Sequence, residues 1–348
     1  MSGHAHADER RDRPTMRDVA ALAGVGIKTV SRVFNDVPTV APDLVERVRA
    51  ASGKLGYRPN LTAASLRRSG GRTNTIGLLL EDVSNPYSSF VHRAVEDYAR
   101  NRNVLVLAGS LDEDPDRERE FTRTLIDRRV DGIIIMPASD DHRYIIAEQL
   151  AGVSFVFIDR PPSPLLADVV VSDNRGGART AVQHLLNSGR RAVAYLGDDI
   201  EVYTARERFA GFCDALAAAG VDCRPELVRH GLRSVDQARD AAREILASAP
   251  PDAIFSSQNL VTIGVVEALH ELGLHHTVAL VGFDDVALAG AIEPGVTVMA
   301  QDPAAVGTEA ARLLFERMNG DDSAPAIHTL PTRLTVRGSG ELPWPATT

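Results

Sequence analysis

The sequence has 348 residues, of which 44% are hydrophobic and 24% are charged, and its formal net charge is −9. The length exceeds one ordinary domain, and the composition is that of a globular protein. No run of about 18 consecutive apolar residues is present, so we expect no membrane-spanning helix, and the first residues lack the apolar segment of a secretory signal. Cys213 and Cys223 match no paired-ligand spacing and suggest no disulfide framework, which favours a cytoplasmic protein.

The charge is distributed unevenly along the chain. Residues 15–72 contain ten Lys and Arg residues against four Asp and Glu residues, a formal +6, whereas residues 1–14 are neutral. The remaining residues therefore carry −15. A basic segment joined to an acidic body is expected when one end binds nucleic-acid phosphates and the rest does not.

Three helices are predicted in the basic segment. Thr15 and Asp18 resemble a capping box that opens a short helix, which a glycine turn at 24–26 ends. A second helix is predicted over 27–34 and a third over 41–55, where apolar residues recur at helical spacing. Two short helices around a tight turn, supported by a third, form a helix-turn-helix, whose second helix faces base edges in the major groove.

The second of these helices carries side chains suited to DNA. Val30 and Val33 point inward, whereas Ile27, Lys28 and Arg32 are not needed by a core. Lysine and arginine bind guanine edges or phosphates, and isoleucine can contact a thymine methyl group. The helix pattern alone equally allows a plain three-helix cap with solvated charges, and these outward side chains favour DNA binding.

Two longer strings stand out here, TMRDVAALAGVGIKTVSRVFN at 15–35 and LGYRPN at 55–60. Together they resemble the signature of the lactose/galactose repressor (LacI/GalR) family. The resemblance implies a homodimer on a pseudo-palindromic, double-stranded operator, with base reading by the second helix. The DNA contacts that it implies are Thr15, Met16, Arg17, Ile27, Lys28, Thr29, Ser31, Arg32, Asn35, Tyr57, Asn60, Ala63 and Leu66. Gly26 departs from the family, which commonly has a helix-capping serine there that touches phosphate.

Residues 60–68 could form two helical turns, followed by a linker-like stretch. Such a segment is too short to be a stable helix alone, so without DNA we expect a flexible tether. The family resemblance implies that two of these hinges fold together in the minor groove. Leu66 from each would then wedge into the central base step. A pyrimidine–purine step, which by family analogy is CG, should be the cheapest to open.

From Thr75 onward, strand-like runs alternate with helical stretches. The runs are 76–80, 104–108, 132–136, 154–158, 192–196, 253–255 and 278–281, and the helices include 87–100, 117–128, 176–187, 207–219, 261–272 and 304–318. This alternation predicts parallel sheets covered on both faces. The length exceeds one doubly wound unit, so we expect two lobes with a ligand cleft at the carboxyl ends of the strands.

Polar groups follow many of these strands. They occur at 84–87, 159–160, 171–174, 206–212, 256–259 and 282–285. Taken singly, each has a structural explanation: Asn85 with Pro86 makes a turn, Asp173 and Asn174 are helix caps, and Arg206 is a surface charge. Their convergence on one edge of the sheets favours a binding site.

The same strings resemble the type I periplasmic sugar-binding fold that the repressor family carries. The matching positions imply effector contacts by Tyr87, Asp159, Arg208, Gln258 and Asp284, with Asp173 near the lobe crossover. Arg208 opposite either aspartate would suit vicinal hydroxyls, because carboxylates accept and the guanidinium donates. The usual Asn-Asp pair of the family is Gln258-Asn259 here, which removes a negative charge. Phe283 or Phe255 could stack on a sugar face, but core packing is the better expectation for both.

Catalytic motifs are missing from the sequence. There is no phosphate-loop lysine motif and no Gly-x-Ser-x-Gly elbow, and the glycines at 24–26 follow a helix rather than a strand. His275-His276 lacks acidic partners at ligand spacing, and His184 is expected to be packed or on the surface. We therefore expect no enzyme, metal or cofactor. A solute-binding protein, or an enzyme with a DNA-binding appendage, is the alternative.

The predicted organisation is an α/β protein with an all-α helix-turn-helix head and a two-lobed, doubly wound, parallel-sheet body of the type I periplasmic binding protein kind. Its segments are a disordered tail (1–14), the head (15–59), the hinge and linker (60–74) and the body (75–340), with an N-lobe at about 75–171 and 302–326 and a C-lobe at about 172–299 and 327–340. No heptad repeat follows, so a dimer on the nucleoid is expected rather than a tetramer.

Overall fold

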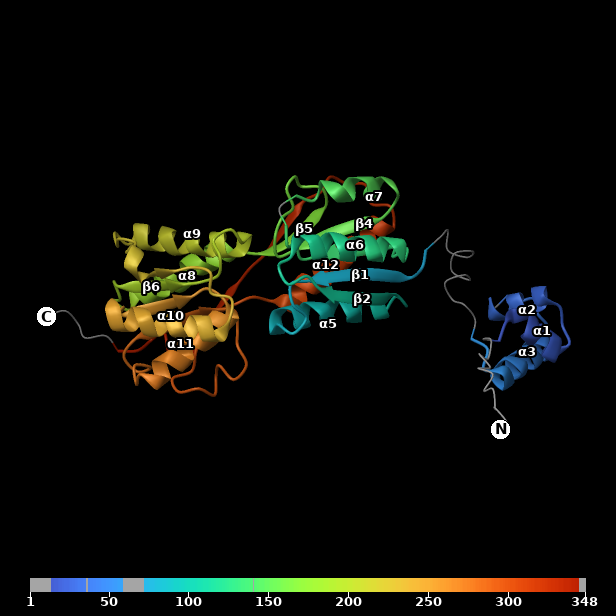
Figure 1. Cartoon of the computed structure of the whole chain (residues 1–348), viewed down its shortest axis with the longest axis horizontal. Helices are drawn as coiled ribbons and strands as arrows, with labels where there is room; N and C mark the ends of the chain where they lie inside the picture. The colour runs from blue at the N-terminus through green and yellow to red at the C-terminus, as the bar shows by residue number, and fades with distance from the viewer. Residues whose placement is uncertain (1–13, 36, 59–71, 140, 344–348) are drawn as a thin grey trace, which may run out of the picture. The chain divides into compact units, whose positions relative to one another are not determined.

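The computed structural model describes residues 14–35, 37–58, 72–139 and 141–343. The chain divides into two compact units, Met1–Thr73 and Asn74–Thr348, which we call the head and the body and treat separately (Figure 1). Most of the predicted tail and hinge, and with them Asn60, Ala63 and Leu66, lies outside the described residues. Among the helices in the described ranges, none is long and apolar enough to cross a membrane.

The described part of the head contains the predicted helices: α1 (Met16–Ala23), α2 (Ile27–Phe34) and α3 (Pro42–Leu55). The predicted capping box is confirmed, because the Thr15 N–H donates to Asp18 at 2.7 Å and the Asp18 N–H donates to the Thr15 hydroxyl at 3.4 Å. Gly24 ends α1 with a φ of 64°, a left-handed conformation that suits glycine. Arg47 of α3 donates to the Ala23 carbonyl at 2.6 Å, so the third helix also holds the turn.

The core of the head is small and made of valines and alanines. Val19 of α1, Val30 of α2 and Val48 of α3 have no exposed surface and belong to one buried cluster. Each such side chain contributes roughly 1.5–3 kcal/mol when it is fully buried. Their packing orients α2, so that the opposite face of this helix is available to a ligand.

The first lobe of the body is built on a parallel sheet. Its strand order is β11-β5-β4-β3-β1-β2 among the described residues. The strands are β1 (Thr75–Leu80), β2 (Leu105–Ser110), β3 (Gly132–Ile135), β4 (Ser154–Ile158), β5 (Asp168–Ser172) and β11 (Ile327–Leu330). The helices are α5 (Pro86–Arg100), α6 (Pro115–Asp127), α7 (Ile146–Leu150) and α12 (Pro303–Met318).

The second lobe repeats this plan with the order β12-β10-β9-β8-β6-β7. The strands are β6 (Val193–Leu196), β7 (Val228–Arg229), β8 (Ala253–Ser256), β9 (Ala279–Phe283), β10 (Thr297–Ala300) and β12 (Arg333–Thr335). The helices are α8 (Asn174–Asn187), α9 (Tyr203–Ala218), α10 (Val235–Ser248) and α11 (Asn259–Glu271). Only β12 runs antiparallel to its neighbour in this described sheet. The predicted fold class is confirmed.

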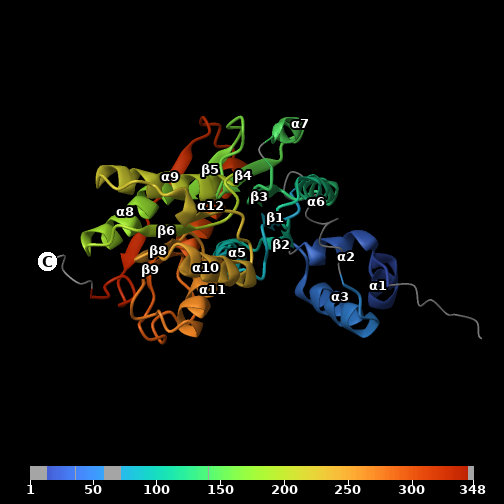
Figure 2. The same ribbon diagram turned by 60° about the vertical axis from the view of Figure 1, so that its left-hand side comes forward.

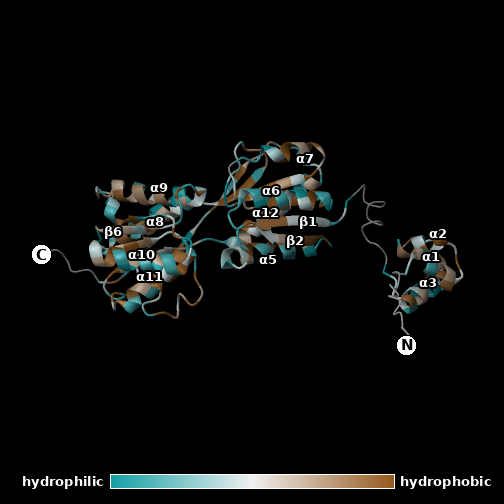
Figure 3. Ribbon diagram, viewed as in Figure 1, coloured by the Kyte–Doolittle hydropathy of each residue, from teal (hydrophilic) through white to brown (hydrophobic). Residues whose placement is uncertain are grey.

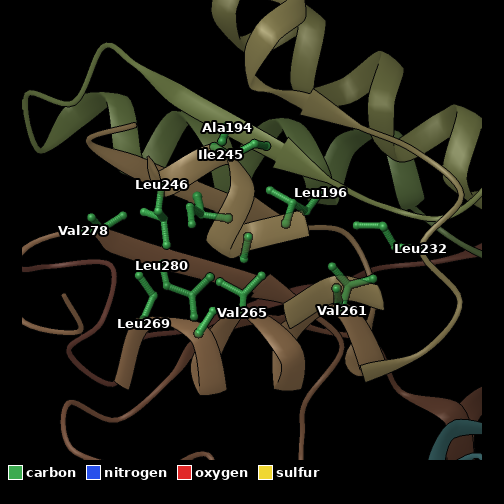
Figure 4. Packing of buried hydrophobic residues seen from close by; sticks show 14 of the residues in the cluster. Ala194, Leu196, Leu232, Ile245, Leu246, Val261, Val265, Leu269, Val278 and Leu280 are labelled. Atoms are coloured by element: carbon green, nitrogen blue, oxygen red, sulfur yellow. The ribbon is translucent and has the colours of Figure 1, made fainter. Parts of the chain in front are cut away.

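Each sheet has a buried cluster on either face. In the second lobe, α8 and α9 cover one face and α10 and α11 cover the other, with β6, β8 and β9 between them (Figure 2). Brown and teal residues alternate along the covering helices, as expected for helices with one buried and one exposed side (Figure 3). Leu246 of α10, Val265 of α11 and Leu280 of β9 show this packing (Figure 4).

Within residues 141–343 the chain crosses between the lobes at three places, namely between β5 and α8, between β10 and α12, and between β11 and β12. The third crossing differs from the prediction, which assigned 327–340 to the C-lobe. β11 instead pairs with β5 in the first sheet. Pro331 follows β11, and because proline has no N–H for a strand ladder, the strand ends there and the chain passes to the second sheet.

The structure also adds β5, β7, β10, α7 and α10 to the predicted elements. β7 has two residues, too few for a periodic signal. β5 is a buried run, DVVVS, that follows a proline-rich loop. α10 has the apolar spacing of an amphipathic helix, with Ala238, Ala242 and Ile245 buried, and could have been found from it.

Candidate functional site

The outward face of α2 carries the predicted base-reading residues. Ile27 is 45% exposed, and Lys28 and Arg32 are exposed, whereas Val30 and Val33 are buried. The predicted division of this helix into two faces is therefore confirmed. Three apolar or basic side chains on the accessible side of a short helix match what a major-groove reader needs.

The polar residues around this helix are partly anchored. Arg32 Nη2 donates to the Thr39 hydroxyl at 2.6 Å, and Asn35 Nδ2 donates to the Ser31 hydroxyl at 3.3 Å. Gly26 occupies the N-cap position of α2 without a side-chain cap, so the first turn of α2 keeps free N–H groups that can bind a phosphate oxygen.

The remaining predicted DNA contacts differ in their surroundings. Thr15 and Arg17 are exposed, and Thr29 is half-buried. Met16 and Tyr57 pack against the core of the head, and the Tyr57 ring lies 5.5 Å from that of Phe34.

The body brings all the predicted effector contacts to one cleft. Tyr87, Asp159, Arg208, Gln258 and Asp284 line the same hollow, whose empty volume is about 720 Å³ including the part that is open to solvent. Because β1, β4, β8 and β9 are parallel within their sheets, the residues that follow them meet at the carboxyl edges.

The two aspartates occupy corresponding places in the two lobes. Asp159 follows β4 and Asp284 follows β9, with φ angles of 69° and 70°. Their N–H groups donate to Val170 and Met299, each on the next strand of the sheet. A left-handed conformation is costly for a residue other than glycine, roughly 1–3 kcal/mol. Such strain is typical of functional sites, and here both carboxylates line the cleft.

Arg208 of α9 is buried and firmly held. Its Nε donates to Asn174 at 2.7 Å and its Nη1 donates to the Ser257 carbonyl at 2.7 Å, while the guanidinium lies 4.0 Å from the centre of the Phe283 ring. Of the two predicted aspartate partners, Asp284 is present at 3.8 Å. Asp159 pairs instead with Arg160, at 3.4 Å. Phe255 and Phe283 have no exposed surface, which confirms their expected place in the core.

A group of acidic residues that was not predicted lines the first-lobe side of the cleft. Arg160 donates two hydrogen bonds to Glu113, one of them at 2.6 Å. Glu81 follows β1 and lies beside this pair in the lining. Burial and the neighbouring Glu113 carboxylate raise the pKa of Glu81 to about 7, and burial likewise raises the pKa of Asp159.

The two lobes are joined across the mouth of the cleft. Asn259 Nδ2 at the start of α11 donates to Asn85 Oδ1 at 2.9 Å, and Asn85 also accepts from the Tyr87 N–H at 3.0 Å as the cap of α5. On the same side, Gln301 donates to Asp284 at 2.5 Å. The structure thus gives a cross-lobe contact to Asn259, where the sequence showed only a change from the family pattern.

Histidines form no metal centre in the described part of the chain. There, no group of three or more His, Cys, Asp or Glu residues is arranged to hold a metal ion. His184 contacts Glu341, and His275 stacks on His270 with ring centres 4.2 Å apart.

Sequence reasoning missed Glu81, Glu113, Asp198 and Arg233 as residues of the cleft. Glu81 had the clearest signal, because a carboxylate directly follows the buried strand 76–80. Glu113 lies in a loop whose approach to Arg160 depends on the fold, and no local pattern would have revealed it.

Both the head and the body are similar to known protein families. Residues 15–60 match the family of bacterial regulatory proteins of the lacI type, and residues 182–340 match the periplasmic binding protein-like domain. The HTH-type transcriptional regulator CelR of Thermobifida fusca is 34% identical over 343 residues, which cover 95% of this chain and 100% of CelR. The ribose operon repressor of Halalkalibacterium halodurans is 32% identical over 93% of this chain and 96% of its own length.

Two solved structures are similar along nearly the whole chain. The lac repressor dimer bound to operator and the anti-inducer ONPF has a TM-score of 0.83 at 25% identity, covering 94% of this chain and 99% of that one. The CelR–cellobiose complex has a TM-score of 0.68 at 31% identity and covers 94% of this chain and 100% of that one.

Proposed function

Because the chain belongs to the LacI family of bacterial regulatory proteins, we propose that it represses transcription by binding a pseudo-palindromic operator as a homodimer. It is a DNA-binding transcription regulator of that family. The observation that carries the proposal is the exposed face of α2, with Ile27, Lys28 and Arg32 directed away from the valine core. A two-fold protein suits a two-fold operator, because each head then reads one half-site.

The hinge completes the proposed DNA interface. Asn60, Ala63 and Leu66 are its minor-groove contacts, and Leu66 of each protomer wedges into the central base step. Unstacking that step costs a few kcal/mol and is offset by the better-wrapped duplex. Thr15, Thr29, Ser31, Asn35 and Tyr57 hold the DNA backbone in this proposal, and Met16 and Arg17 are further DNA contacts.

The cleft of the body holds a small effector, which we propose is a sugar or a related polyhydroxylated metabolite. Arg208, Asp159 and Asp284 offer a fixed donor and two acceptors to vicinal hydroxyls. The solved CelR relative is a complex with cellobiose. An effector that binds both lobes alters their angle, which changes the spacing of the hinges and so the operator affinity.

No catalytic step is part of this proposal. The relatives matched along the chain are transcription regulators, which favours this function over a free-standing solute-binding protein or an enzyme. A DNA regulator of this kind acts in the cytoplasm, on the nucleoid.

The direct test is operator binding by the full chain. Selection from a randomised DNA pool, followed by fluorescence anisotropy, should yield a pseudo-palindrome bound about 10³-fold or more tightly than a shuffled duplex of the same length. Equal affinity for both duplexes would overturn the proposal. Leu66→Ala should weaken specific binding far more than non-specific binding, whereas equal losses would refute the wedge.

A further inference from the structure

The cleft carries more negative than positive charge. Among the described residues that line it are five carboxylates, on Glu81, Glu113, Asp159, Asp198 and Asp284, and three guanidinium groups, on Arg160, Arg208 and Arg233. The difference is not spread evenly between the lobes. Glu81, Glu113 and Asp159 all lie on the first-lobe side, where Arg160 is the single lining cation in the described part of the chain.

The ion pairs among these lining groups do not include Glu81. Arg160 is bidentate to Glu113 and also reaches Asp159. In the second lobe, Arg233 lies 3.3 Å from Asp198, and Arg208 lies 3.8 Å from Asp284. The Glu81 carboxylate has no hydrogen-bond partner among the described residues, although it is half-buried and lies near both Glu113 and Arg160. An ionised carboxylate in such a place is unfavourable unless a cation joins it.

A further polar atom of the same cleft has no partner. The Gln301 Oε1 atom is buried without a hydrogen-bond partner among the described residues, and Gln301 lines the cleft. Buried polar groups are normally satisfied, so this atom and Glu81 together indicate a ligand with hydrogen-bonding groups.

We propose that the effector is a sugar-like molecule that carries a protonated amino group, and that Glu81 binds this group. The inference rests on the proposed function of the cleft and specifies its ligand class. The ammonium group supplies the second cation that Glu81, Glu113 and Asp159 lack, and the hydroxyls of the same molecule bind Arg208 and the aspartates. The excess of carboxylates disfavours phosphorylated sugars, because like charges repel in a partly enclosed site.

The test compares matched sugars that differ in the amino group. Three pairs serve as probes, namely glucose with glucosamine, galactose with galactosamine, and cellobiose with the β-1,4-linked disaccharide of glucosamine. Isothermal titration calorimetry on the full chain at neutral pH should show, in at least one pair, that the amino sugar binds about tenfold more tightly than its neutral partner, the effect of one partly enclosed charge pair. Glucose 6-phosphate should bind more weakly than glucose.

Glu81→Gln identifies the group responsible. It keeps the shape of the side chain and removes the charge, so the preference for the amino sugar should fall to less than about threefold. Glu120→Gln makes the same change on the exposed surface of α6 in the same lobe and should leave the preference unchanged. Retained operator binding by both variants shows that they are folded.

Two results would overturn the inference. The first is that no amino sugar binds more tightly than its neutral partner in any pair. The second is that the preference persists in Glu81→Gln. If neutral sugars bind and alter operator affinity while amino sugars do not, the repressor proposal stands and the amino-group inference fails. If no specific operator is found, the failure is that of the proposed function, and the calorimetric comparison still decides the ligand class of the cleft.

Discussion

The head and the body place their recognition side chains in opposite surroundings. On α2, Ile27 and Lys28 are exposed and make no contact that the core of the head needs. In the body, Arg208 is 6% exposed and is held by Asn174, by the Ser257 carbonyl and by the Phe283 ring. A residue of the first kind is expected to affect binding alone, whereas a residue of the second kind affects binding and folding together.

The largest effect is expected from Arg208→Ala. This change leaves Asn174 and Asp284 without their buried cation, and loss of one member of such a group destabilises a protein by about 3 kcal/mol. Thermal unfolding of the full chain should show a markedly lower melting temperature for the body and a loss of effector binding. Arg206→Ala removes an exposed arginine from the same helix and is the control. Similar stability of the two variants would contradict the contrast drawn between head and body.

Lys28→Ala tests the exposed recognition residues of the head. A side chain that reads a base edge contributes about 1–3 kcal/mol of discrimination, so operator affinity should fall roughly 5- to 150-fold. The melting temperature should not change, because Lys28 is exposed. Fluorescence anisotropy measures the first quantity and calorimetry the second, with Lys54→Ala on α3 as the control for loss of charge. A loss of affinity no greater than that of Lys54→Ala would remove Lys28 from the base-reading set.

Asn259→Ala should have a smaller, intermediate effect. It deletes the hydrogen bond to Asn85 that joins the lobes, which is worth about 1 kcal/mol. Because the lobes then lose a contact across the cleft, effector and operator affinities should both change by about fivefold. Asn187→Ala deletes an amide hydrogen bond within α8 and is the matched control. Unchanged affinities in Asn259→Ala would show that this contact does not bias the lobe arrangement.

The smallest effect is expected in the pH dependence of stability. The pKa of Glu81 in the folded protein is raised to about 7, so this group favours the folded state below its unfolded pKa, and that contribution is lost as the pH rises through about 7. Glu81→Gln should therefore raise the melting temperature at pH 8 by a few degrees relative to the parent, and the gain should vanish near about pH 4. Melting curves of both proteins between about pH 4 and pH 8 test this prediction. A difference in melting temperature that is the same at every pH would show that ionisation of Glu81 is not the cause.

Local signals predicted the head and the general plan of the body well. The capping box at Thr15 and the glycine turn are defined by neighbouring residues, so they could be found without the fold. The predicted effector contacts follow strands or open helices, and parallel strands bring such residues to one edge. The sequence could not show that Arg160 pairs with Glu113, because their 47-residue separation is bridged only by the tertiary structure.

The third crossover between the lobes could not be predicted from the strand pattern of the sequence. The run from Ile327 to Arg337 reads as one strand, yet Pro331 divides it between two sheets. The strained aspartates were likewise beyond prediction from the sequence. Asp159 and Asp284 adopt left-handed conformations, which aspartate tolerates better than most residues, but no local pattern in the sequence assigns this conformation to these two positions.

The three crossovers have a consequence for the synthesis of the protein. α12 and β11 complete the first lobe, but the chain supplies them only after nearly all of the second lobe. Val306 and Leu314 belong to the buried cluster of the first sheet. At about 5–20 residues per second, roughly 10–30 s pass between the synthesis of β5 and that of β11. During that interval one face of the first sheet lacks one of its two covering helices, so the nascent chain exposes apolar surface that chaperones can bind, while the head, whose residues are contiguous, can already fold.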